Sequence, residues 1–115
     1  MPKFKLLKSD TVEGIEKKIN ETLQDSMMPV GGVFYSEENA EFLQKMIRVK
    51  KPPISMECAF NFAVGRRAEE LEKNIQHYVD NHYVFLGNTF EHKGFYYQGM
   101  MKGDMRFTPK DLNEK

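Results

Sequence analysis

Hydrophobic residues recur with helical spacing in two stretches of the chain, and charged residues fill the positions between them. The hydrophobic positions are Val12, Ile15, Ile19 and Leu23 in the first stretch and Ala68, Leu71, Ile75, Tyr78 and Val79 in the second. Spacings of three and four residues place such side chains on one face of a helix. The pattern predicts two amphipathic helices, each with one face buried in a core.

Each predicted helix is flanked by segments that have the character of β-strands. In residues 58–64, Cys58, Phe60, Phe62 and Val64 alternate with small or polar residues, which is the period of a half-buried strand. The other strands are predicted at 4–8, 30–35, 42–49, 84–91 and 95–102. Glycines at Gly31, Gly32 and Gly87 inside these segments indicate a bulge or a close approach of two backbones.

The two halves of the chain are similar in sequence. A shift of 56 positions aligns residues 4–36 with 60–92 without a gap, and seven of the 33 pairs are identical. The identical pairs include Phe4 with Phe60 and Gly31 with Gly87. A shift of 54 then pairs Gln44 with Gln98, so the last turn is two residues longer in the first half. An internal repeat of this kind fixes the order of elements.

The predicted organisation is a single domain, consistent with a chain of 115 residues. It comprises a first βαββ copy at 3–49, a linker at 50–55, a second copy at 56–102 and a tail at 103–115. The prolines of the linker interrupt regular structure, and Thr108 with Pro109 suggests a short helix in the tail. The expected fold is α+β, with about six mainly antiparallel strands in one sheet and two helices on one face of it.

These segments resemble a short prokaryotic and phage family, the domain of unknown function numbered 1737. The resemblance rests on four segments, which are Phe4-Lys5-Leu6-Leu7, the helix from residue 10 to 25, Met28-Pro29-Val30-Gly31-Gly32 and Tyr96-Tyr97-Gln98-Gly99-Met100-Met101-Lys102. The usual Gly-Trp before the proline is replaced by Ser26-Met27-Met28, and the second copy has Phe85-Leu86-Gly87-Asn88 in place of Pro-Val-Gly-Gly. The resemblance implies this fold and a small accessory protein of inhibitory or sequestering type, and it implies no reaction.

The charge, cysteine content and apolar runs of the chain make some classes of function less favoured than others. Seventeen basic and seventeen acidic residues cancel, so the chain lacks the overall positive charge that favours non-specific nucleic-acid binding. A single cysteine excludes an internal disulfide and fits a cytoplasmic location. No apolar run is as long as a membrane span, so we expect no membrane association. A basic cluster of Arg48, Lys50 and Lys51, together with Lys45, leaves a nucleic-acid-binding accessory protein as an alternative.

Large hydrophobic side chains lie on both sides of the predicted third strands, although the helices shelter only one face of a single sheet. Because exposed apolar patches are rarely left in water, we expect the second face to be covered by an identical subunit, a foreign protein or a flat ligand. A homodimer is the expected assembly. The residues predicted for this partner or dimer surface are Phe42, Met46, Tyr97, Met100 and Met101.

The start of the second helix differs from the start of the first. Asp10 to Glu13 supply a capping box, whereas Gly65, Arg66 and Arg67 precede the second helix without a capping side chain. Free backbone N–H groups beside two guanidinium groups can hold a phosphate or carboxylate. The alternative is that both arginines are solvated or pair with nearby acids.

Aromatic residues complete the predicted ligand site. Asn88, Phe90 and His92 occupy alternate positions of one strand, and Tyr96 follows across a short turn. An aromatic wall near the arginines suits a nucleotide, because a ring stacks on the base while the guanidinium groups hold phosphate. The same aromatic residues are equally explained as core residues.

Enzymatic motifs are not recognisable in the chain. It has no Walker loop, no Gly-x-Ser-x-Gly segment and no dinucleotide fingerprint. The alternation around Cys58 favours a buried strand residue over a nucleophile, and the three histidines lack metal-ligand spacing, so no metal or cofactor is expected. The sequence favours a non-catalytic binding protein, which blocks a host protein or sequesters a small anionic, nucleotide-like ligand. A small enzyme of unknown reaction is the second alternative.

Overall fold

The computed structural model describes residues 3–48 and 58–102, and it has the α+β fold that the sequence predicts. Residues 3–48, here unit 1, contain β1 (Phe4–Ser9), α1 (Val12–Leu23), β2 (Met27–Ser36) and β3 (Glu41–Arg48). Residues 58–102, here unit 2, contain β4 (Ala59–Gly65), α2 (Ala68–Asp80), β5 (Val84–His92) and β6 (Phe95–Lys102). The predicted linker at 50–55, its lysines and the tail at 103–115 lie outside the described residues.

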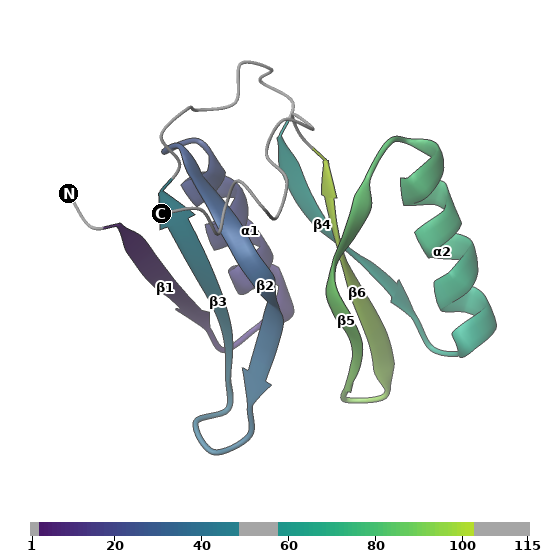
Figure 1. Ribbon diagram of the computed structural model, residues 1–115. Coiled ribbons are helices and arrows are strands. Elements are labelled where there is room, and N and C mark those ends of the chain that lie inside the picture. Colours follow the sequence, from purple (N-terminus) through teal and green to yellow (C-terminus); the bar gives the residue numbers. More distant parts are fainter. Residues whose placement is uncertain (1–2, 49–57, 103–115) are drawn as a thin grey trace.

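The strands form two sheets of three rather than the single sheet of six that we expected. Sheet A has the order β1-β3-β2 and sheet B the order β4-β6-β5, and all neighbours are antiparallel (Figure 1). Positive φ angles also fall at paired positions, at Ser26 and His82 after the helices and at Gly31 and Gly87 in the strands. The two units therefore share their strand order and these backbone features.

The first residues of the two helices differ from each other as the sequence predicts, but the cap of α1 is Thr11 and not the predicted capping box of Asp10 and Glu13. Thr11 is the N-cap of α1, and its side chain accepts a hydrogen bond of 2.9 Å from the backbone N–H of Gly14. Arg67 is the N-cap of α2, and its side chain makes no capping bond. The carboxylate of Glu70 accepts from the backbone N–H of Arg66, so one of the free donors expected there is occupied.

Helix α1 contacts both sheets, whereas α2 covers only the far side of sheet B (Figure 1). The Asn20 amide donates to the Phe60 carbonyl and accepts from the Phe60 backbone N–H, both at 2.8 Å. The Glu16 carboxylate accepts from the Phe62 N–H at 2.9 Å. Because β4 is an edge strand, these two side chains satisfy backbone groups that would otherwise lack partners. The two units are thus joined through polar side chains of α1.

The core explains why the predicted partner surface is not a surface. Phe42, Met46 and Met100 are fully buried, Met101 is 7% exposed, and Tyr97 is half-buried against the main core cluster. Phe42 and Met46 lie in one core cluster with Ile15 and Ile19 of α1, whereas Met100 packs with Leu71 of α2 in a second cluster. Unit 1 covers the other face of sheet B, which carries Tyr97 and Met101. The prediction of a partner surface at these five residues was wrong because the helices and unit 1 of the same chain bury them.

A buried glutamine occupies the same place in each unit. The Gln98 amide donates to the carbonyls of Gly87 and Gly99 at 3.1 and 3.0 Å, and the Thr89 hydroxyl donates to its side-chain oxygen at 2.7 Å. The Gln44 amide likewise donates to backbone carbonyls, those of Val30, Gly31 and Lys45. Its side-chain oxygen, however, is buried without a partner among residues 3–48 and 58–102, because Val33 stands where unit 2 has Thr89.

We therefore expect Val33→Thr to raise the free energy of unfolding by about 1 kcal/mol, because it supplies the missing donor to Gln44. Urea denaturation monitored by circular dichroism measures this change. The reciprocal variant Thr89→Val removes the corresponding bond from Gln98 and should lower stability by a similar amount. A destabilised Val33→Thr protein would contradict the equivalence of the two glutamine sites.

Candidate functional site

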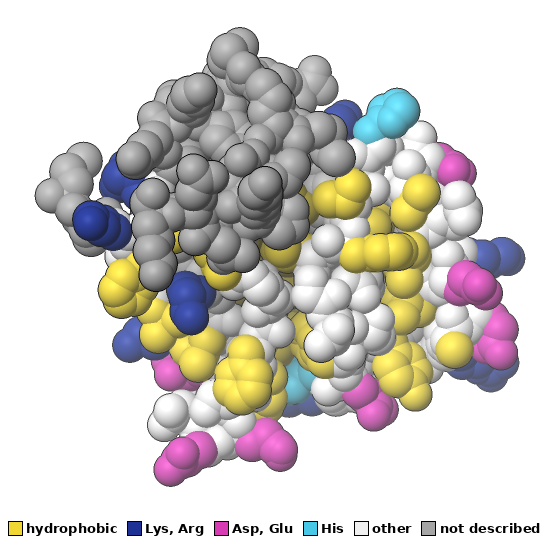
Figure 2. Space-filling model, viewed as in Figure 1, with side chains coloured by type: hydrophobic (Ala, Val, Ile, Leu, Met, Phe, Trp, Pro, Cys, Tyr) yellow, Lys and Arg dark blue, Asp and Glu magenta, His cyan; other side chains and the backbone are white. Residues whose placement is uncertain are grey.

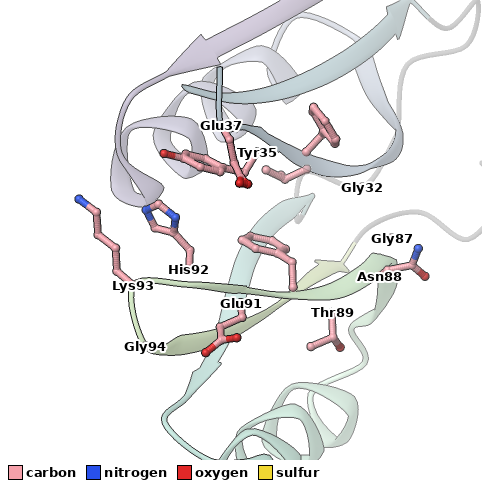
Figure 3. A pocket seen from close by; sticks show the side chains of 13 residues that line it. Gly32, Tyr35, Glu37, Gly87, Asn88, Thr89, Glu91, His92, Lys93 and Gly94 are labelled. Atoms are coloured by element: carbon pink, nitrogen blue, oxygen red, sulfur yellow. The ribbon is translucent and has the colours of Figure 1, made fainter. Parts of the chain in front are cut away.

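A groove lies between β2 and β5, the edge strands of the two sheets. Its volume is about 730 Å³, and its walls come from residues 32–35 and 37 of unit 1 and residues 87–94 of unit 2 (Figure 3). Pockets that hold small ligands have volumes of about 300 to 1,000 Å³. The site is therefore large enough for a ligand, and both units build it.

Two glycines allow the strands to approach each other at one end of the groove. A Cβ added to Gly32 would lie 2.6 Å from the Cα of Gly87, and a Cβ added to Gly87 would collide with the Cα of Gly32. Gly87 also has a φ of 76°, in the region that favours glycine, and the register of β5 shifts here between Leu86 and Phe90. The sequence predicts a bulge or a close approach of two backbones, and the structure has both at Gly87.

Aromatic rings gather at the other end of the groove. The His92 ring lies 4.4 Å from that of Tyr35 and 4.9 Å from that of Phe42, measured between centroids. Phe90 stacks on Tyr97 at 5.3 Å with an interplanar angle of 22°. Because residues of both units take part, this cluster fixes the position of His92 relative to β2.

Charged side chains are divided between the two sides of β5. Figure 3 shows His92 and Lys93 on the side that faces β2, whereas Thr89 and Glu91 point away from it and Asn88 extends outward at the Gly87 end of the strand. The pairing of β5 with β6 agrees with this orientation, because Glu91 pairs with Tyr96, which packs on the α2 side of the sheet. Glu37 faces the groove from unit 1. The groove between β2 and β5 thus carries one ammonium group, one imidazole and one carboxylate, with the Asn88 amide at its Gly87 end.

The structure brings together only part of the predicted ligand site. Asn88, Phe90 and His92 line the groove, while Tyr96 lies on the opposite face of sheet B, against Ala63, Leu71 and Met100. Successive residues of a strand point to opposite faces, and Tyr96 pairs with Glu91 rather than with Phe90 or His92. Tyr96 is therefore separated from the groove by the sheet itself.

Arg66 and Arg67 are exposed and do not line the groove. The Arg66 guanidinium lies over the Phe95 ring, 5.4 Å from its centroid, which is the geometry of a cation–π contact. The expected seat for an anion between these arginines and the aromatic wall is therefore not assembled at one place. Arg48 and Lys45 of the alternative basic cluster lie on β3, and its lysines 50 and 51 fall outside the described residues.

Tyr35 and Lys93 line the groove and were missed in the sequence, whereas Gly32 was recognised only as a mark of a bulge or close backbone approach. Tyr35 and His92 lie at the ends of β2 and β5, and only the crossing of these strands brings them together. The glycines at corresponding places in both halves were the available signal, because they marked where two backbones approach. The sequence did not show that the two backbones belong to different units.

Tyr97 lies beneath the groove on the face of β6 that meets the main core. Burial, followed by the nearby charge of Glu13, raises the pKa of its hydroxyl above the usual value of about 10. The hydroxyl therefore remains protonated at neutral pH and contributes no charge to the site.

Cys58 is half-buried and packs against the main core, in agreement with a structural role. Within residues 3–48 and 58–102, no group of three or more His, Cys, Asp or Glu side chains is arranged to hold a metal ion. Neither α1 nor α2 is long and apolar enough to cross a membrane.

Comparison with protein-family models, curated proteins and solved structures gives no match in any of the three. The resemblance to the domain of unknown function numbered 1737 therefore stays a prediction from the residues.

Proposed function

We propose that this chain is a non-catalytic binding protein that sequesters a small, nucleotide-like ligand in the groove between β2 and β5. The observation that supports this most directly is the composition of one groove wall, where an aromatic cluster, the His92 imidazole and the Lys93 ammonium group lie on the side of β5 that faces β2. The proposed site keeps Asn88, Phe90 and His92 from the sequence prediction and replaces the arginines by Lys93.

The chemistry of a nucleotide matches the wall in three respects. An aromatic side chain such as Phe90 offers a face for stacking of a base, which is worth about 1–3 kcal/mol per base. The Lys93 ammonium group attracts phosphate, and an N–H of the His92 imidazole can donate to a phosphate oxygen. The Asn88 amide supplies both a donor and an acceptor for the polar edge of a base.

Glu37 restricts which anions suit this groove. Its carboxylate faces the same space as Lys93 and would repel a ligand carrying several negative charges. We therefore favour a ligand with a single phosphate over a triphosphate. Sequestration in the cytoplasm, by enclosing the ligand between the two units, would be the whole mechanism.

Isothermal titration calorimetry with AMP and with 3′,5′-cyclic AMP tests the proposal. We expect Lys93→Ala and His92→Ala each to weaken binding about tenfold, which corresponds to about 1.4 kcal/mol. Glu91→Gln is the matched control, since Glu91 lies on the same strand and points away from β2. It should leave the affinity within about twofold. Absence of binding to the wild-type protein, or an equal loss in the control, would reject a nucleotide site here.

A further inference from the structure

Burial differs sharply between residues that correspond in the two units. Phe60 and Phe62 of β4 are 0% and 6% exposed, whereas their counterparts in β1, Phe4 and Leu6, are 61% and 48% exposed. On the helices, Leu23 of α1 is 4% exposed and its counterpart Val79 of α2 is 40% exposed. The two surfaces that join unit 1 to unit 2 thus exist a second time, uncovered, on β1 and on α2.

The polar groups of this junction also recur. Glu16 and Asn20, which bind the backbone of β4, correspond to Glu72 and Gln76 of α2, and both of these are exposed. Glutamic acid is retained, and asparagine is replaced by the other side-chain amide. In the single chain the Gln76 amide donates to Asp80 one turn further along α2, at 2.8 Å on the surface.

The register of β1 leaves the required backbone groups available. Phe4 pairs with Ile47 as Phe60 pairs with Met101, and these pairs correspond under the shifts of 56 and 54. The Arg48 N–H bonds the carbonyl of Lys3, so the alternate residues Phe4 and Leu6 direct their backbone groups to the free edge of sheet A. This edge is the counterpart of the β4 edge that α1 satisfies.

Charge is complementary between the two uncovered surfaces. Around β1, Lys3, Lys5 and Lys8 are exposed. On α2, the exposed acidic residues are Glu69, Glu70, Glu72 and Asp80. Opposite charges on facing surfaces steer association and select the orientation.

We infer that a second copy of this chain binds head to tail, with α2 of one copy against β1 of the next. Glu72 would accept from the Leu6 N–H of the neighbouring copy, and the Gln76 amide would exchange Asp80 for the Phe4 backbone. Because β1 and α2 lie at opposite ends of the molecule (Figure 1), the contact is heterologous and produces an open chain of copies or a closed ring. Figure 2 shows hydrophobic side chains at the surface over sheet A, where the neighbour would pack. This inference is independent of the proposed ligand.

Sedimentation velocity of the full chain across a range of concentrations tests the assembly. The wild-type protein should sediment as species of at least twice the chain mass of 13.5 kDa, and less so in high salt. Leu6→Asp and Val79→Asp alter exposed side chains on the two surfaces, and each variant alone should lose at least tenfold in self-association. Lys73→Arg is the control, because it keeps the charge at a position that is exposed on both helices, Lys17 on α1 and Lys73 on α2.

Mixing the two aspartate variants distinguishes this arrangement from a symmetric dimer. Leu6→Asp retains an intact α2 and Val79→Asp retains an intact β1, so the mixture should form a complex of one copy of each and grow no further. A wild-type protein that stays monomeric at all concentrations overturns the inference, whether a partner of another kind or the chain's own residues 103–115 cover the face. An assembly that the mixture fails to restore also overturns it.

Discussion

Gly87→Ala should lower the free energy of unfolding by about 3 kcal/mol. The added methyl group collides with the backbone of Gly32 where β2 and β5 cross, and neither strand can move away without opening the groove. Forcing extra atoms into a packed site costs about 1–3 kcal/mol. The positive φ of Gly87 adds about 1 kcal/mol for any residue with a Cβ. Urea denaturation followed by circular dichroism gives the total.

Gly31→Ala separates the two contributions. Gly31 corresponds to Gly87 and has nearly the same φ, 72° against 76°, yet an added Cβ there meets no atom within 4 Å. Gly31→Ala should therefore lower the free energy of unfolding only by the conformational contribution, about 1 kcal/mol. Equal losses in the two variants would show that the crossing of the strands contributes nothing to stability.

Asn20→Ala should also lower the free energy of unfolding by about 3 kcal/mol. The variant leaves the N–H and C=O groups of Phe60, whose side chain is fully buried, without their partners. Each unsatisfied buried group costs about 1–3 kcal/mol. Asn20→Leu, which keeps the side-chain volume, should lose nearly as much, because hydrogen bonding rather than packing is removed.

The counterpart Gln76→Ala is the control for this experiment. Gln76 is exposed, and within the part of the chain that the structure describes its amide bonds Asp80 alone, on the surface. Substitutions at such positions usually change stability by less than about 0.5 kcal/mol. If Asn20→Ala proved as mild as Gln76→Ala at low protein concentration, the bonds from α1 to β4 would not be what joins the units.

The helices and strands were predictable because their signals are local. Helical spacing located α1 and α2, and the repeat fixed the βαββ order in both halves. The arrangement of the two sheets was not predictable in this way. Whether six strands merge or stack depends on side chains such as Asn20, which bonds a strand 40 residues away and looks like an ordinary surface residue of an amphipathic helix.

The groove was predictable only on its β5 side. Asn88, Phe90 and His92 were recognised from their alternation along one strand, which is a local pattern. Tyr96 was placed with them because it is close in sequence, but one step along a strand turns a side chain to the opposite face. The facing wall from β2 depends on how unit 1 docks on unit 2, and no pattern within either half records this.

The hydrogen bonds of Gln98 affect the affinity that the groove can have for a ligand. Its amide anchors the carbonyls around the irregular stretch of β5, so this wall is already held in shape before anything enters. A binding site that is already ordered loses less conformational entropy when the ligand binds. More of the free energy of the contacts therefore remains as affinity. Removing these hydrogen bonds should therefore weaken ligand binding, even though Gln98 itself does not contact the ligand.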